Sequence, residues 1–161
     1  MHINITKDDF DVNAELYKFN QNISNHGAVS IFLGRVRPEQ DLKSMQIDCY
    51  PEMAQKEVRN IAEISSAKWS LDSVTIVHRY GLLKPNDNIV IVITGSGHRS
   101  DCMKANEFIM DFLKSAAPFW KKEIYSDKAI WIEQNQGDLE LSLIHISEPT
   151  RRYAISYAVF C

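Results

Sequence analysis

Apolar residues recur along the chain with periods that separate helices from strands. The clearest helical period covers residues 100–117 and stops at Pro118, which cannot continue a helix. A second helix is predicted to begin at Pro51 and to end before Ser70, because proline suits the first helical turn and an apolar stripe follows it. Residues 8–22 form a weaker third pattern behind acidic side chains that favour a helix N-terminus.

The remaining apolar segments are short and rich in β-branched residues, which predicts strands. Residues 27–33 (GAVSIFL) indicate a buried strand, and residues 73–81 and 88–97 indicate a hairpin whose turn contains Lys-Pro-Asn-Asp. Further strands are expected at residues 45–50, 119–125 and 129–133. Together these elements predict a single α+β domain with a mainly antiparallel sheet.

Composition narrows the class of protein. The 161 residues are 45% hydrophobic, which suits one domain with a real core. The formal net charge of −3 argues against a general nucleic-acid binder. Three scattered cysteines do not form a disulfide framework, and no metal is expected because the histidines and cysteines lack ligand spacing. Without a signal pattern or an apolar run of about 18 residues, the expected location is the cytoplasm.

The C-terminal segment differs from the rest of the chain. From Leu141 it runs LSLIHISEPTRRYAISYAVFC, which resembles the translation of a sequencing-library adapter. We therefore expect a domain over residues 1–140 and a non-native tail over residues 141–161. The alternative is a genuine C-terminal strand. If the tail is foreign, the basic residues and the cysteine within it have no function.

The sequence Gly-Ser-Gly-His-Arg-Ser lies where a strand gives way to the strongest helix. Helix N-termini attract anions through free N–H groups and the helix dipole, and His98 and Arg99 add side-chain donors there. The sequence is neither a P-loop nor a dinucleotide fingerprint. It indicates either an anion site or an ordinary strand-to-helix turn with an exposed arginine.

Lysines surround the end of the same helix. Lys114 lies on its last turn, and Lys121 and Lys122 follow Pro118 and two aromatic residues. Such lysines are usually solvated and stabilise the helix dipole. Large aromatic side chains beside them are also able to desolvate an ammonium group, which favours acid/base or nucleophilic chemistry.

Two arginines flank the end of the first predicted strand in Leu-Gly-Arg-Val-Arg. Because side chains alternate along a strand, Arg35 and Arg37 are expected on one face, where two guanidiniums suit a phosphate. A solvated strand end is the commoner explanation for such a pair.

Several segments together resemble one family. LGRVR, CYPEMAQKE, HRYGLLKPNDNIVIV, GSGHRS and FLKSAAPFWKKE occur in the order and spacing of the molybdopterin synthase large subunit, over residues 27–133. The resemblance implies an α/β hammerhead fold and a homodimer within a heterotetramer. Each subunit would bind a small ubiquitin-like sulfur carrier with a C-terminal Gly-Gly thiocarboxylate. The substrate would be cyclic pyranopterin monophosphate, which receives two sulfurs to form the dithiolene of molybdopterin.

The same resemblance implies roles for single residues. Lys114 would be the catalytic lysine nearest the thiocarboxylate, and Lys121 a second essential group that contacts the pterin. The implied substrate-binding residues are Arg35, Val36, Arg37, His98, Arg99, Lys122 and Glu123. No metal and no further cofactor is implied.

One position departs from the family pattern. Relatives often have an arginine where this chain has Asn135, a residue expected near the neighbouring subunit's site. Lys128 is an adjacent basic residue that offers a substitute charge. The alternative function is therefore a catalytically weak module that binds a ubiquitin-like carrier or a phosphorylated pterin without converting it.

Overall fold

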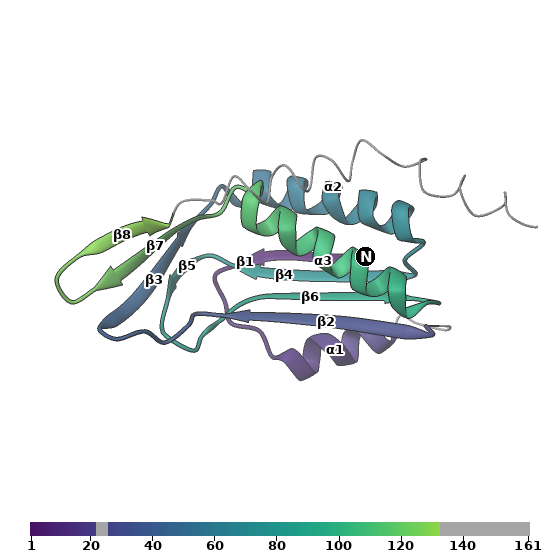
Figure 1. The fold of residues 1–161 in the computed structure, drawn as a ribbon, viewed down its shortest axis with the longest axis horizontal. Coiled ribbons are helices and arrows are strands. Elements are labelled where there is room, and N and C mark those ends of the chain that lie inside the picture. The colour runs from purple at the N-terminus through teal and green to yellow at the C-terminus, as the bar shows by residue number, and fades with distance from the viewer. Residues whose placement is uncertain (22–25, 133–161) are drawn as a thin grey trace, which may run out of the picture.

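The structure is a computed structural model that describes residues 1–21 and 26–132. Its described strands form two four-stranded sheets (Figure 1). The large sheet has the order β1 (His2–Thr6), β4 (Ser73–Arg79), β6 (Asn88–Ser96) and β2 (Ala28–Arg35). The small sheet has the order β5 (Gly81–Leu83), β3 (Leu42–Asp48), β7 (Trp120–Tyr125) and β8 (Ala129–Ile132).

All strand pairs are antiparallel except β1 with β4. The small sheet projects from one end of the large sheet, where strands β4 and β6 connect through β5 (Figure 1). The predicted α+β class with a mainly antiparallel arrangement, of the hammerhead type, is confirmed.

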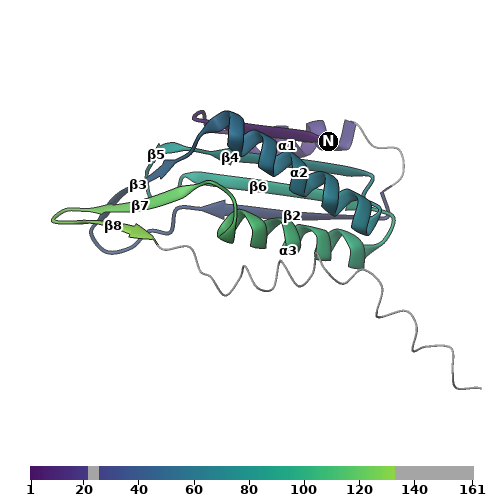
Figure 2. The same cartoon turned by 90° about the horizontal axis from the view of Figure 1, so that it is seen from above.

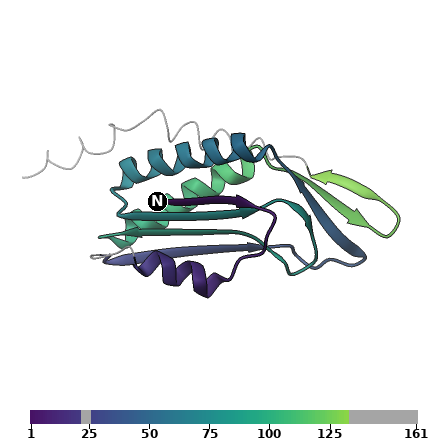
Figure 3. The same cartoon turned by 180° about the vertical axis from the view of Figure 1, so that it is seen from behind.

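Helices cover both faces of the large sheet. α2 (Pro51–Trp69) and α3 (Arg99–Ser115) lie side by side on one face, and α1 (Val12–Gln21) lies on the other (Figures 2 and 3). The main core lies between the sheet and the α2–α3 pair, and a smaller apolar cluster, which includes Phe19, lies under α1. No described helix combines the length and apolarity that a membrane crossing requires.

The helix ends follow the expected chemistry. α2 begins at Pro51, and Ser70 caps its C-terminus in the left-handed conformation, with φ of 48°. α1 begins later than predicted, because the Asp11 carboxylate accepts hydrogen bonds from the backbone of Asn13 and Ala14 at 2.7 and 3.0 Å. These bonds make Asp11 the N-cap.

Three strand expectations differ from the structure. Strand β1 was not predicted, and neither was β5, which begins at the last residue of the first predicted hairpin strand and pairs with β3 in the small sheet. Strand β2 was expected to be buried but is an edge strand, in which Val29 and Ile31 are 41% and 45% exposed. An edge strand has a neighbour on one side only, so its apolar composition did not imply burial.

Candidate functional site

Lys114 and Lys121 lie close together at the junction of helix α3 and strand β7. Lys114 is on the last turn of α3 and is exposed. Lys121 is partly buried and pairs across the small sheet with Ile47, a core residue. Burial and the nearby positive charge of Lys114 lower the pKa of Lys121. The arrangement therefore yields a lysine that gives up its proton more readily than usual beside a second cation.

His78 is a third member of this cluster. Its ring stacks on that of Phe119, with centroids 3.8 Å apart and an angle of 12° between the planes. Its Nδ1 lies 2.8 Å from the backbone oxygen of Arg79 and donates to it. Burial, followed by the charge of Lys121, lowers the pKa of His78 to about 3, so the imidazole is neutral at physiological pH.

The sequence did not single out His78 as a site residue. A histidine at the end of an apolar strand is most often an ordinary core residue, and no local pattern connects it with a segment 41 residues later in the chain. One signal could have found His78. Reactive side chains recur at the ends of strands and helices, and these ends meet at one end of the large sheet.

Lys122 and Glu123 do not share one surface. Side chains alternate along a strand, so Glu123 lies on the same face of β7 as Lys121, while Lys122 lies on the opposite face. There its ammonium group is 5.2 Å from the ring centroid of Trp131. Glu123 accepts a hydrogen bond from the Tyr125 hydroxyl at 2.9 Å. Alternation thus places the Lys122 side chain on a different face of β7 from Glu123, and the substrate wall that the resemblance implies for these two residues stays a prediction.

Arg35 and Arg37 are exposed and flank Val36, which is 1% exposed. The Val36 backbone donates to the oxygen of Asp87 at 3.0 Å and accepts from the nitrogen of Asn86 at 2.9 Å. Its side chain packs in the main core and so fixes the position of the arginines on either side, while the substrate-binding role implied for Val36 stays a prediction. The C-terminal end of β2, which is Arg35, lies toward the small sheet, as does the C-terminal end of α3 (Figures 1 and 2).

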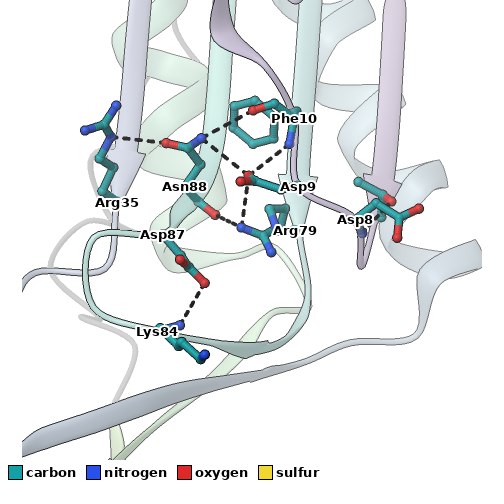
Figure 4. Close-up of polar contacts among 9 residues, drawn as sticks. Asp8, Asp9, Phe10, Arg35, Arg79, Lys84, Asp87 and Asn88 are labelled. Carbon is teal, nitrogen blue, oxygen red and sulfur yellow. Dashed lines mark hydrogen bonds and ion pairs between the residues drawn. The ribbon is translucent and has the colours of Figure 1, made fainter.

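A polar network holds Arg35 on its inner side (Figure 4). Its Nε donates to Oδ1 of Asn88 at 3.1 Å, and Asn88 in turn contacts Asp9 and the oxygen of Phe10. Because only Nε is used in this bond, the two terminal nitrogens of the guanidinium point away from Asn88. The two terminal nitrogens are able to bind an oxyanion in a bidentate manner.

His98 and Arg99 lie far from the lysine pair. Both are exposed at the N-terminus of α3, and His98 is its N-cap residue. Lys114 is fifteen residues after Arg99 on the same helix, which corresponds to about 22 Å along the axis. The prediction that these side chains meet Lys114 and Lys121 around one hollow is therefore wrong for a single chain, because a rigid helix separates them.

Two further expectations concern the C-terminal region. Lys128 lies in the turn between β7 and β8, where its ammonium group is 5.5 Å from the ring centroid of Tyr125. Asn135 and the expected foreign tail lie outside the described residues.

Comparisons with known proteins agree on one family. Residues 5–116 match the family model described as MoaE protein. The chain is 38% identical over 143 residues to the molybdopterin synthase catalytic subunit of Brucella melitensis, covering 87% of this chain and 88% of that protein.

Solved structures give the same result. The molybdopterin biosynthesis MoaE protein of Burkholderia ambifaria has a TM-score of 0.76 and 39% identity, covering 89% of this chain and 97% of that one. Molybdopterin synthase from Staphylococcus aureus has a TM-score of 0.73 and 31% identity, covering 81% of this chain and 96% of that one. The chain therefore belongs to the MoaE protein family, that of the molybdopterin synthase catalytic subunits.

Proposed function

We propose that this chain is the catalytic subunit of a cytoplasmic molybdopterin synthase, a sulfurtransferase of molybdenum cofactor biosynthesis. Its substrate is cyclic pyranopterin monophosphate, into which two sulfurs are inserted to form a dithiolene. The observation that carries the proposal is the pairing of Lys114 with Lys121, whose pKa is lowered by burial and by its neighbour.

The two lysines suit this chemistry in different ways. The exposed ammonium of Lys114 attracts the anionic thiocarboxylate that brings the sulfur. Lys121 faces the pterin, where its lowered pKa lets it exchange a proton with the reacting atoms. Both positive charges stabilise the negative charge that develops when the cyclic phosphate ester opens.

The described cysteines support a sulfur source outside this chain. Burial and the carboxylate of Asp48 raise the pKa of the Cys49 thiol, and burial is also the main cause that raises the pKa of Cys102. A cysteine that carries sulfur works as a thiolate, which these environments disfavour. The sulfur is instead delivered by a small ubiquitin-like partner subunit whose C-terminal Gly-Gly bears a thiocarboxylate.

His98 and Arg99 enter the proposal through a second copy of the chain. The α3 helix keeps them about 22 Å from Lys114 in the same chain. In the proposed homodimer, they bind the substrate's phosphate and pterin oxygens at the lysine pair of the neighbouring copy. Arg35 and Arg37 are proposed to contribute to phosphate binding as well.

Reconstitution tests the proposed activity. Purified chain, thiocarboxylated partner and cyclic pyranopterin monophosphate are mixed, and dithiolene formation is measured. The proposal predicts product with the unaltered chain and none with Lys114→Ala. Lys104→Ala is the matched control, because Lys104 is an exposed lysine on the same helix. Partner binding without any product would instead support the binding-module alternative.

A further inference from the structure

Phe119 lies at the connection between the two lysines. Helix α3 ends when the backbone nitrogens of Ala116 and Ala117 both donate to the oxygen of Phe112 at 2.9 Å. After Pro118, the nitrogen of Phe119 donates to the oxygen of Ala117 at 2.8 Å, and strand β7 begins at the next residue. Any movement of Phe119 therefore changes how the end of α3 is placed relative to the start of β7.

The buried ring of His78 supports this connection from another part of the chain. His78 and Phe119 are 1% and 2% exposed, and their nearly parallel rings are in full contact. The bond from His78 Nδ1 to the backbone of Arg79 fixes the tilt of the imidazole. Strand β4 is paired on both sides at this position, with Ile5 of β1 and Val90 of β6. The imidazole is therefore a rigid platform.

We propose that His78 is a positioning residue of the active site, whose imidazole ring supports Phe119 and thereby holds Lys121 in its desolvated place beside Lys114. The proposal rests on the function proposed above, because it gives His78 its role through the lysine pair. His78 itself does not touch the substrate in this account.

The positioning of Lys121 by His78 does not depend on a charge on His78. Among the described residues, Lys114 from α3 is the charge that acts on Lys121, and Glu123 lies on the same face of its own strand, while β3 and β8 place Ile47 and Ile132 opposite it. Because the buried imidazole is neutral, replacing it changes none of these charges. A change in the behaviour of Lys121 would then report a change in its position and burial.

The experiment measures the pKa of Lys121 by NMR titration of its labelled side chain in the isolated chain. His78→Ala removes the platform and is expected to raise the pKa of Lys121 toward its ordinary value, because Lys121 then becomes less desolvated. His78→Phe keeps a flat ring under Phe119 and is expected to restore a pKa close to that of the unaltered protein. Ile76→Val is the control, since it disturbs the same face of β4 without touching the stacked rings.

The outcomes separate a positioning role from a structural one. An unchanged Lys121 pKa in folded His78→Ala would overturn the proposal, as would a His78→Phe variant that behaves like His78→Ala. If His78→Ala does not fold, His78→Leu serves as the second variant, since it fills part of the space without a flat ring. Dithiolene formation is measured separately, with about a tenfold loss expected for His78→Ala. Absence of product from the unaltered chain would defeat the proposed function while leaving the titration interpretable.

Discussion

Arg35 donates from Nε to Oδ1 of Asn88 at 3.1 Å, at the point where the pairing of β2 with β6 shifts its register. The amide nitrogen of Asn88 faces the other way and contacts Asp9 and the oxygen of Phe10 at 3.4 and 3.3 Å (Figure 4). Asn88 thus joins the strand end that carries the arginines to the segment that leads into α1.

This relationship predicts unequal costs for two substitutions. Asn88→Ala is expected to lower the free energy of unfolding by about 1–2 kcal/mol, because it removes several hydrogen bonds that connect different segments. Arg35→Ala removes a single bond of an exposed side chain and is expected to cost less than about 0.5 kcal/mol. Urea denaturation of the two variants measures the difference, and equal costs would argue that the network is not formed in solution.

Asp9 is expected to matter through Arg79. The Arg79 side chain is 9% exposed, and its Nη1 donates to Asp9 Oδ1 and to the backbone oxygen of Asn88, each at 3.0 Å. Asp9→Ala leaves a buried guanidinium without its carboxylate and is expected to destabilise the fold by about 1–3 kcal/mol. Asp9→Asn keeps an acceptor and is expected to cost less. Thermal unfolding of both variants at one pH distinguishes this order from its reverse.

Two glycines near the predicted anion turn offer a matched comparison. A Cβ added at Gly95 would lie 2.5 Å from the ring of His26, whereas one added at Gly97 meets nothing within 4 Å. Gly95→Ala is therefore expected to cost about 1–3 kcal/mol through overpacking. Gly97→Ala is expected to change stability by less than about 0.5 kcal/mol. Similar losses for both in denaturant titrations would contradict the close packing of His26 on β6.

The pKa of His78 predicts how stability depends on pH. The folded protein holds this pKa at about 3, below the ordinary histidine value of 6.5, so below pH 6.5 the unfolded chain binds a proton that the folded chain does not. The stability that depends on a neutral His78 is fully present above pH 6.5. It is lost as the pH falls toward 3, at a limiting slope of about 1.4 kcal/mol per pH unit.

His78→Phe provides the comparison, because it removes this titration and keeps the ring. Between pH 7 and pH 5, the unaltered protein is expected to lose about 2 kcal/mol more stability than the variant. Denaturant titrations at the two pH values measure the difference. Equal losses would show that His78 is accessible to protons in the folded state.

The sequence predicted the elements better than their association. The helix that ends at Pro118 and the one that begins at Pro51 follow from local rules on proline and apolar periodicity, and both are present. The division into two sheets was not predictable, since the three residues of β5 are too few to show a period. The edge position of β2 also depends on tertiary pairing that its own composition does not encode.

The candidate site was predictable only where local chain geometry brings its residues together. Lys114 and Lys121 are seven positions apart around one proline turn, so their proximity follows from local chain geometry. His98 is also close to Lys114 in sequence, yet the helix between them keeps them apart. Lys121 and Lys122 are adjacent in the sequence, yet strand alternation places their side chains on opposite faces of β7. His78 depends on a long-range contact that only the fold reveals.

The most direct measurement compares the neighbouring lysines of β7 in the reconstituted reaction. Lys121→Ala and Lys122→Ala are assayed for the rate of dithiolene formation with saturating thiocarboxylated partner and cyclic pyranopterin monophosphate. The account predicts a loss of about 100-fold or more for Lys121→Ala and a change of less than about threefold for Lys122→Ala. Comparable losses in both variants, or full activity of Lys121→Ala, would contradict the central role of the lysine pair.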